Sequence, residues 1–493
     1  MRRPQLLEQY GLYINGKWQE ASNQETLTAI SPADGNELAK IAQATKADVD
    51  IAVESAWSAF WSWKNTTVKE RARMLNEIAD VIDANREHLA TVESLDNGKP
   101  IRETLNIDIP LAADHFRYFA GCILADEGSA NMLGNEMMSL ILREPIGVVG
   151  QIIPWNFPFL MGAWKLAPVL AAGCCTVLKP SSETSLSLLE LMRLIHDIVP
   201  AGVVNLITGS GSKSGKFMLD HPRFSKLAFT GSTGVGIEVA KAAAAKLIPA
   251  TLELGGKSAN IFFEDCKWEM AMDGFQLGIL FNQGQVCCAG SRVFVQDTIY
   301  DQFVEDAKRR LAMIKIGDPL DPETQMGSQV NGVQVNKVLE YVDLAKEEGA
   351  TIAHGGQKAF EQGCFLQPTM FTNVTNDMRI SREEIFGPAV VIIKFSTEEE
   401  VIEMANDTDF GLAGAVWTRD INRAIRVSRA IEAGRIWVNT YNAIPEGAPF
   451  GGYKTSGIGR ETHKVILDHY TQMKNIMINL SEEPSGFYPL KEG

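Results

Sequence analysis

The sequence lacks an excess of positive charge. Its 493 residues include 46 Lys and Arg against 61 Asp and Glu, which gives a formal net charge of −15. A nucleic-acid backbone would meet net repulsion from such a chain unless a local basic patch overcame it. We therefore expect no nucleic-acid partner.

Cysteine is scarce as well, with seven residues in the chain. The number is odd, and no CxxC pair is matched by a His or Cys pair downstream, as a structural zinc site would require. We expect neither a disulfide framework nor a metal site, and a reducing cytoplasm suits these thiols best. The seven are Cys122, Cys174, Cys175, Cys266, Cys287, Cys288 and Cys364.

Long uninterrupted apolar runs are also missing. The longest apolar stretch, residues 157–178, contains Lys165 and Pro168, so a bilayer would leave charge and broken backbone unsatisfied. This stretch predicts a buried helix that leads into a strand. Residues 1–10 lack the apolar core of a signal peptide. We expect neither secretion nor contact with a membrane.

The order of the apolar segments predicts an α/β protein of two or three domains. Asn15-Gly16 between apolar flanks predicts a tight hairpin. Apolar residues recur at helical spacing from residue 48, and we expect the first 120 residues to be mainly helical. After residue 144, short apolar runs alternate with helices of ten or more residues. That alternation is typical of βαβ units and a parallel sheet.

A glycine-bearing turn, residues 230–236, follows the predicted strand 226–229 and opens an Ala-rich helix. Free backbone N–H groups and the positive end of a helix dipole suit a phosphate at such a turn. The spacing of the glycines departs from the usual GxGxxG dinucleotide fingerprint. Phosphate binding and an ordinary strand-to-helix turn both remain open here.

Two further windows could carry chemistry. Cys287 and Cys288 follow a polar, glycine-bearing loop, and they are either two buried thiols or a nucleophile with its neighbour. Glu253 ends an apolar strand just before two glycines. It is either paired with a cation such as Lys257 or a general base whose pKa is raised by burial. No His lies near either cysteine in the sequence.

Together with three others, these windows resemble NAD(P)-dependent aldehyde dehydrogenases, in which they occur in the same order. The resemblance extends over nearly the whole chain, and six ordered motifs are far more specific than any one of them. The windows are PWNFP at 154–158, FTGSTGVG at 229–236, LELGGKS at 252–258, GQVC at 284–287, EEIFGP at 383–388 and PFGGYK at 449–454.

The resemblance implies roles for three catalytic residues. Cys287, after Gly-Gln-x, would be the nucleophile, and Cys288 would be a packing neighbour. Asn156 would donate its side-chain amide to the oxyanion of a thiohemiacetal, although a turn residue between two prolines is the rival interpretation. Glu253 would activate the water that hydrolyses the resulting thioester, which favours a free acid as the product.

The resemblance also implies a cofactor site. Ser182 occupies a position where many NAD-preferring relatives carry Glu, so discrimination against a 2′-phosphate should be weakened, and we expect NAD with some use of NADP. The implied cofactor residues are Ile153, Pro154 and Trp155 along the cleft, Lys179 and Ser182 near the adenosine ribose, Gly231, Ser232 and Gly236 in the turn at the pyrophosphate, Leu254 beside the nicotinamide, and Glu384 and Phe386 at its ribose.

The implied substrate tunnel is apolar and narrow, as suits a small aliphatic aldehyde such as acetaldehyde. Betaine aldehyde ranks lower, because a trimethylammonium group prefers an aromatic cage and Ile444 stands where cation-binding relatives tend to have an aromatic residue. Each of these residues could also be ordinary core. The expected lining residues are Phe157, Met161, Trp164, Phe281, Val286, Tyr441, Ile444 and Phe450.

The implied architecture is a Rossmann-like cofactor domain, an α/β catalytic domain and a small antiparallel β extension through which such enzymes form homodimers or homotetramers. Two other function classes compete with the oxidoreductase: a thiol hydrolase or esterase using Cys287 and Glu253, and a non-catalytic structural protein of the same fold. The expected segments are 1–125 and 144–256 for the cofactor domain, 257–455 for the catalytic domain, 126–143 and 456–480 for the extension, and 481–493 for a tail.

Overall fold

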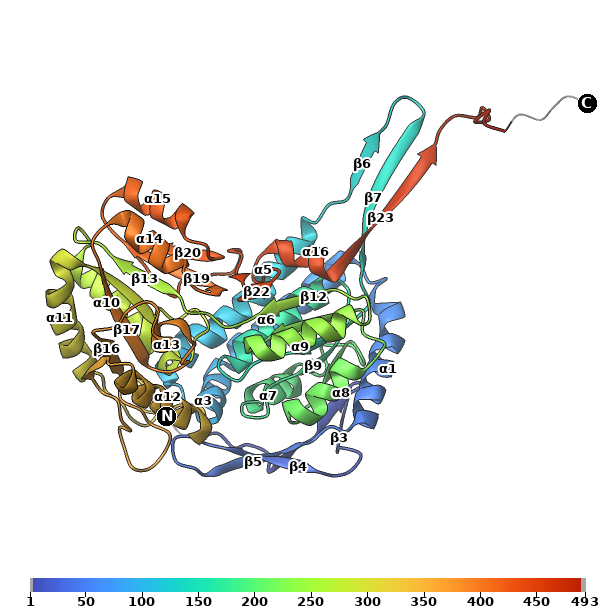
Figure 1. Ribbon diagram of the computed structural model, residues 1–493. Coiled ribbons are helices and arrows are strands. Elements are labelled where there is room, and N and C mark those ends of the chain that lie inside the picture. The colour runs from blue at the N-terminus through green and yellow to red at the C-terminus, as the bar shows by residue number, and fades with distance from the viewer. Residues whose placement is uncertain (1–2, 489–493) are drawn as a thin grey trace, which may run out of the picture.

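Two parallel-rich sheets dominate the computed structural model, which describes residues 3–488 (Figure 1). The first has eight strands, of which the central ones are parallel, while β22 and β2 pair antiparallel with their neighbours. Its order is β22 (Gly457–Ile458), β12 (Ala250–Glu253), β11 (Lys226–Thr230), β8 (Val148–Ile152), β9 (Cys175–Lys179), β10 (Val204–Leu206), β2 (Leu12–Ile14) and β3 (Lys17–Gln19).

Helices cover the strands of this sheet, so β9 and β11 are buried along their whole length. That burial explains why these strands read as continuous apolar runs rather than as alternating ones. The helices are α1 (Lys46–Trp63), α6 (Pro158–Ala171), α7 (Leu186–Ile195), α8 (Lys216–Asp220) and α9 (Thr233–Ala244). The stretch 157–178 is therefore the predicted buried helix and strand, α6 followed by β9.

The second sheet has seven strands, parallel except for the edge strand β15. Its order is β15 (Thr351–His354), β16 (Thr369–Thr372), β17 (Ala389–Phe395), β14 (Arg292–Gln296), β13 (Ala259–Phe262), β19 (Ala413–Trp417) and β20 (Arg435–Val438). Its helices are α10 (Trp268–Leu280), α11 (Tyr300–Ala312), α12 (Gly332–Glu347), α13 (Arg379–Arg382), α14 (Glu398–Asn406) and α15 (Ile421–Ala430).

A helical region from the N-terminal part of the chain lies against α6 and reaches the second sheet (Figure 1). Capping boxes start two of its helices: Thr45 pairs with Asp48 at α1, and Thr67 pairs with Glu70 at α2. The further elements are α2 (Val68–Ala84), α3 (Arg86–Asn97), α4 (Ile101–Glu103), a π-helical turn (Thr104–Asp108) and α5 (Ile109–Leu124).

The expected helical character of the first 120 residues holds only from residue 46 onward. Asn15 and Gly16 do form a tight hairpin, with φ of 53° and 75°. Strands β1 (Gln9–Tyr10), β4 (Thr26–Ile30) and β5 (Glu37–Ala42) form a separate three-stranded sheet. These strands escaped prediction because runs of two to six residues carry little periodicity.

An antiparallel extension projects from the body, built from β6 (Ser129–Met132), β7 (Met137–Pro145) and β23 (Thr471–Asn479) (Figure 1). The predicted extension segment 456–480 needs one correction, because β22 within it pairs with β12 and belongs to the eight-stranded sheet. The other segment boundaries stay a prediction. Of the predicted tail 481–493, residues 489–493 lie outside the described part of the chain.

No helix within residues 3–488 is long and apolar enough to cross a membrane. All seven cysteines are free thiols. Among the described residues, no group of three or more His, Cys, Asp or Glu side chains is placed to hold a metal ion.

Candidate active site

One cavity of about 280 Å³ gathers most of the residues predicted from the sequence. The loops that line it follow strands of the first sheet and precede strands of the second, so both halves of the molecule contribute to it. The predicted residues in its wall are Cys287, Glu253 and Asn156; Pro154, Trp155, Gly231, Ser232, Leu254, Glu384 and Phe386; and Phe157, Met161, Trp164, Phe281, Val286, Ile444 and Phe450.

The two neighbouring thiols differ in exposure. Cys287 is partly exposed to the cavity, whereas Cys288 is fully buried, with Asn442 Oδ1 3.8 Å from its sulfur. The hydrogen bond with the Cys288 thiol, burial, and the nearby carboxyl groups of Glu384 and Glu253 raise the pKa of the Cys287 thiol. Cys287 is therefore the thiol that a molecule in the cavity can reach. Because its pKa is raised, a nearby group must favour the thiolate before the sulfur can attack.

Glu253 ends β12 with its side chain buried in the cavity wall, and its Oε2 has no hydrogen-bond partner in the protein. Burial raises the pKa of Glu253 well above its ordinary value, and the neighbouring Glu461 adds to this, while Lys165 and Arg460 oppose it. An unpartnered carboxyl with a raised pKa is able to accept a proton from water.

The alternative of an ion pair between Glu253 and Lys257 does not occur. The Lys257 ammonium instead donates to the backbone carbonyls of Ile380 and Glu383, both at 2.7 Å. Glu253 thus remains available to the cavity.

Asn156 lies in the cavity wall with 5% of its surface exposed. Its Nδ2 donates to the backbone carbonyl of Gln285 at 2.9 Å. A primary amide carries two N–H groups, so the second one remains for a guest beside Cys287.

The glycine-bearing turn opens α9, as the sequence predicts. Ser232 is the residue before the helix, and its side chain makes no capping hydrogen bond. The first backbone N–H groups of α9 are therefore not bound by the Ser232 hydroxyl. The buried hydroxyl of Thr230 also lacks a hydrogen-bond partner. A Cβ on Gly236 would lie 2.4 Å from Leu254 Cδ2, so glycine permits the close packing of the helix on Leu254. The residues present therefore fit a phosphate-bearing cofactor.

Lys179 and Ser182 lie outside the cavity wall, Lys179 as the last residue of β9 and Ser182 in the loop that follows. The Lys179 ammonium donates to the carbonyl of Pro180 at 2.9 Å, and burial lowers the pKa of Lys179 to about 8. Ser182 is half-buried, while Glu183 is exposed and accepts a hydrogen bond from Asn331 Nδ2 at 2.9 Å. Glu183 therefore does not replace the missing carboxylate at Ser182.

At the opposite wall, Glu384 accepts a hydrogen bond from the Gly256 N–H at 3.0 Å. Burial raises the pKa of Glu384, although this N–H and Lys337 oppose the shift. Phe386 has a left-handed backbone, with φ of 63°, and its ring meets the Trp155 ring edge-on at 5.2 Å. The Glu384 carboxyl and these two rings therefore line one side of the cavity together.

The remainder of the wall is aromatic and aliphatic. The rings of Phe157 and Phe281 stack at 5.8 Å, and those of Trp164 and Phe450 meet edge-on at 5.4 Å. This lining favours an apolar guest.

Besides Lys179, Ser182 and Gly236, two more predicted residues lie outside the cavity wall. Tyr441 is not part of the cavity wall, because its buried hydroxyl donates to the Cys288 carbonyl at 2.9 Å and its ring packs on Trp437. Ile153 is buried at the end of β8, where its N–H donates to the Lys179 carbonyl. Both residues support the site from behind the residues that face the cavity.

Several residues of the cavity wall are not predicted by the sequence. Gln334 and Lys337 lie three residues apart on α12 and so share one face of it, but no helix was predicted at these residues and no sequence signal marked them. Gln334 Nε2 donates to the Phe386 carbonyl at 2.5 Å, so it holds the wall beside Glu384. The missed residues are Ile107, Asp108, Leu111, Leu160, Thr230, Gly255, Cys288, Gln334, Lys337 and Asn442.

Comparison with known proteins decides the family. Residues 18–476 match the model of the aldehyde dehydrogenase family. The chain belongs to the aldehyde dehydrogenase family. The predicted family, α/β fold and oxidoreductase class are thereby confirmed.

Individual relatives of this aldehyde dehydrogenase agree. It is 48% identical, over 97% of its length and 96% of the relative's, to an acetaldehyde dehydrogenase of Pseudomonas aeruginosa. A solved NAD+ complex of an aldehyde dehydrogenase from Bacillus cereus is 43% identical with a TM-score of 0.95, covering 96% of this chain and 97% of that one. A betaine aldehyde dehydrogenase of Staphylococcus aureus in complex with NAD+ is 40% identical with the same TM-score, covering 98% and 97%.

Proposed function

We propose that this aldehyde dehydrogenase oxidises a small aliphatic aldehyde such as acetaldehyde to the free carboxylic acid, with NAD as the hydride acceptor. The observation that carries the proposal is the pairing of a partly exposed thiol, Cys287, with an unpartnered buried carboxyl, Glu253, in one apolar cavity. The Pseudomonas relative named for acetaldehyde supports the substrate, and the NAD+ complexes of the solved relatives support the cofactor.

The first step makes a bond between the Cys287 sulfur and the aldehyde carbon. The thiol gives its proton to water, the C–S bond forms, and the π electrons of the carbonyl move to its oxygen. The free N–H of the Asn156 carboxamide and the backbone N–H of Cys287 are the donors proposed for this oxyanion.

NAD, when bound, accepts the hydride that leaves the former aldehyde carbon. Gly231, Ser232 and the start of α9 would hold its pyrophosphate, and Glu384 with Phe386 would hold the nicotinamide ribose. Lys179 and Ser182 would hold the adenosine ribose. The unpartnered Thr230 hydroxyl and the free start of α9 are the observations that fit the residues to this cofactor.

Glu253 acts in the last step. Its carboxylate takes a proton from water as the water oxygen bonds to the thioester carbon, and the C–S bond then breaks, which frees the Cys287 thiolate and the carboxylic acid. Burial of Glu253 supports this assignment, because a raised pKa brings a carboxyl toward the range in which a general base works.

Betaine aldehyde is the second candidate substrate. The aromatic faces of Trp164 and Phe450 would suit a trimethylammonium group, and solved relatives act on betaine aldehyde by name. Ile444 adds an aliphatic surface to the same wall, and the acetaldehyde relative is the more similar one, which favours the aliphatic substrate. A thiol hydrolase would leave the Gly231 turn and Glu384 without a role.

The enzyme is proposed to assemble as a homodimer or homotetramer in a reducing cytoplasm. The exposed edge of β23 supports assembly, because an unpaired strand edge invites pairing with another chain. Seven free thiols support the compartment.

The test mixes the purified chain with acetaldehyde and NAD and follows the absorbance of reduced cofactor. Steady formation of reduced cofactor that is lost in Cys287→Ser supports the proposal. If kcat/KM is higher for betaine aldehyde than for acetaldehyde, the second candidate is favoured. If the chain hydrolyses esters but oxidises no aldehyde, the hydrolase is favoured.

A further inference from the structure

The loop that leads to Cys287 has an unusual backbone. Asn282, Gln283 and Gly284 adopt left-handed conformations in succession, with φ of 48°, 56° and 71°. Residues with a Cβ seldom adopt this conformation, and two in a row persist only where the surroundings hold them. Cys287 follows three residues later, so whatever holds this loop also places the nucleophile.

Glu103 is one of the groups that hold the loop. This buried residue ends α4, and its Oε2 accepts the backbone N–H of Asn282 at 2.9 Å. Burial raises the pKa of Glu103 to about 8, so near neutral pH the side chain is largely the uncharged acid. Both forms of the carboxyl keep an oxygen that accepts this hydrogen bond.

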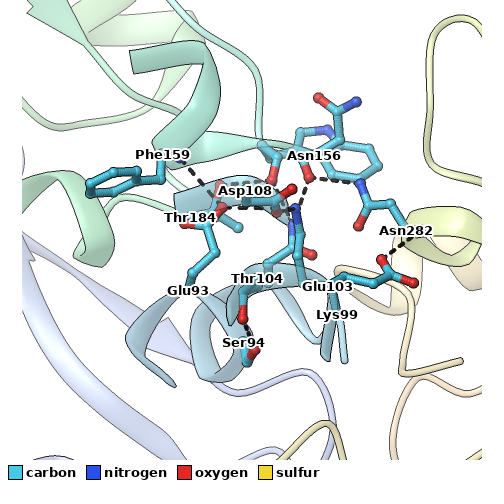
Figure 2. A network of polar contacts seen from close by, with 12 residues as sticks. Glu93, Ser94, Lys99, Glu103, Thr104, Asp108, Asn156, Phe159, Thr184 and Asn282 are labelled. Atoms are coloured by element: carbon cyan, nitrogen blue, oxygen red, sulfur yellow. Dashed lines mark hydrogen bonds and ion pairs between the residues drawn. The ribbon is translucent and has the colours of Figure 1, made fainter. Parts of the chain in front are cut away.

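The segment that carries Glu103, residues 99–108, is held by buried contacts of its own (Figure 2). The buried Lys99 ammonium lies 2.7 Å from Asp108 Oδ2 and 4.1 Å from the centre of the Phe157 ring. The π-helical turn Thr104–Asp108 connects Glu103 to Asp108. Through Lys99, the segment 99–108 contacts Phe157, the residue that directly follows Asn156.

Asn282 contacts the Asn156 backbone directly and is linked to the Asn156 side chain through the Gln285 carbonyl. The Asn282 Nδ2 donates to the Asn156 carbonyl at 2.7 Å and to the Gln285 carbonyl at 3.2 Å (Figure 2). The same Gln285 carbonyl accepts one N–H of the Asn156 carboxamide. Because an amide is planar, fixing one N–H fixes the direction of the other.

We propose that Glu103 and Asn282 are positioning residues of this reaction, which hold the free N–H of Asn156 where the oxyanion forms. Glu103 fixes the backbone of Asn282, and Asn282 fixes Asn156 and the Gln285 carbonyl. Neither residue touches the substrate. The inference rests on the proposed function, because it assigns the oxyanion to Asn156.

The first variant is Asn282→Gly, which keeps a residue that adopts φ near 48° without strain and removes the side chain with its carboxamide. We expect kcat/KM for acetaldehyde to fall by about 10- to 100-fold, since a misplaced oxyanion donor acts in the chemical step. Binding of NAD, measured by titration, should not change. The matched control is Asn373→Gly, which removes another left-handed asparagine whose carboxamide donates to the Gly349 carbonyl at 3.1 Å, and it should keep the wild-type kcat/KM.

The second pair of variants is Glu103→Gln and Glu103→Leu. Glutamine resembles the uncharged acid and keeps an acceptor for the Asn282 N–H, so it should retain most activity, whereas leucine leaves that N–H unpaired and should reduce kcat/KM. Thermal unfolding of each variant separates loss of fold from loss of positioning. This pair carries the test if Asn282→Gly does not fold.

A double-mutant cycle with Asn156→Ala shows whether these residues act through Asn156. If they do, adding Asn282→Gly or Glu103→Leu to Asn156→Ala should reduce kcat/KM by less than about threefold further. Fully additive losses, or an Asn282→Gly variant as active as the Asn373→Gly control, would overturn the inference. A wild-type chain that oxidises no aldehyde would instead refute the proposed function, and that result is visible before any variant is compared.

Discussion

At the scale of single residues, the adjacent cysteines Cys287 and Cys288 have different surroundings. Cys287 reaches the cavity, while Cys288 is closed in, with Asn442 at its sulfur and Tyr441 at its carbonyl. Reactivity of a thiol depends on access and on its surroundings, so position in the fold rather than residue type separates the two.

The Cys287→Ser variant should lose aldehyde oxidation by at least about 1,000-fold in kcat, because no other exposed thiol lies in the cavity to form the thioester. Cys288→Ser should keep most of the activity. Both are measured by reduced-cofactor absorbance, with circular dichroism to check folding. Equal losses in two folded variants would remove the distinction between the thiols.

The raised pKa of Glu253 predicts a pH profile. A general base works only in its deprotonated form, so steady-state turnover should rise with pH as Glu253 loses its proton, over a range well above the ordinary glutamate pKa. In Glu253→Gln that rise in steady-state turnover should disappear, leaving only the dependence due to the Cys287 thiol. A variant with the wild-type profile would assign the titration to another group.

At the scale of elements, the sequence predicts well whatever depends on local pattern. The strand, turn and helix at 226–244 follow directly from an apolar run, glycines and helical spacing. The contact of Glu103 with Asn282 joins residues 179 apart, and Glu103 directly precedes a π-helical turn that no periodicity reveals. Tyr441 lies behind the cavity wall with its hydroxyl bound to the Cys288 carbonyl, and a family resemblance does not fix which way a side chain points.

The exposed edge strand β23 makes a prediction about assembly. Met473 and Met477 lie on one face of β23, with 76% and 51% of their surfaces exposed. Replacing both with lysine should shift the chain to a smaller assembly in size exclusion with light scattering, since charge on an edge strand opposes pairing with another chain. Met313→Lys, at an exposed methionine after α11, is the control. An unchanged assembly in the double variant would place the interface elsewhere.

At the scale of the whole molecule, the site exists only because both sheets meet at one cavity. The loops after β8 and β11 carry Asn156 and the Gly231 turn, the end of β12 carries Glu253, and the loop before β14 carries Cys287. The expected site for the adenosine ribose lies beyond the cavity wall, at Lys179 and Ser182. The choice of cofactor is therefore separable from the chemistry at Cys287.

The choice between NAD and NADP should reflect this separation. We expect a higher kcat/KM with NAD, because the half-buried Ser182 and one buried lysine form no charged clamp for a 2′-phosphate, and measurable activity with NADP, because no carboxylate repels it. Ser182→Glu should lower kcat/KM for NADP by about tenfold or more through charge repulsion, with little change for NAD. A clear preference of the wild type for NADP would contradict this expectation.

The most direct measurement is a single-turnover experiment on Glu253→Gln with acetaldehyde and NAD, followed by mass spectrometry of the intact chain and of its peptides. Hydride transfer precedes the step that needs the base. The variant should therefore form one equivalent of reduced cofactor per active site and then accumulate an acetyl group on Cys287, with a later turnover slower by about 100-fold or more. Rapid steady turnover without an acetylated chain, or an acetyl group on Cys288, would contradict a Cys287 thioester hydrolysed with the help of Glu253.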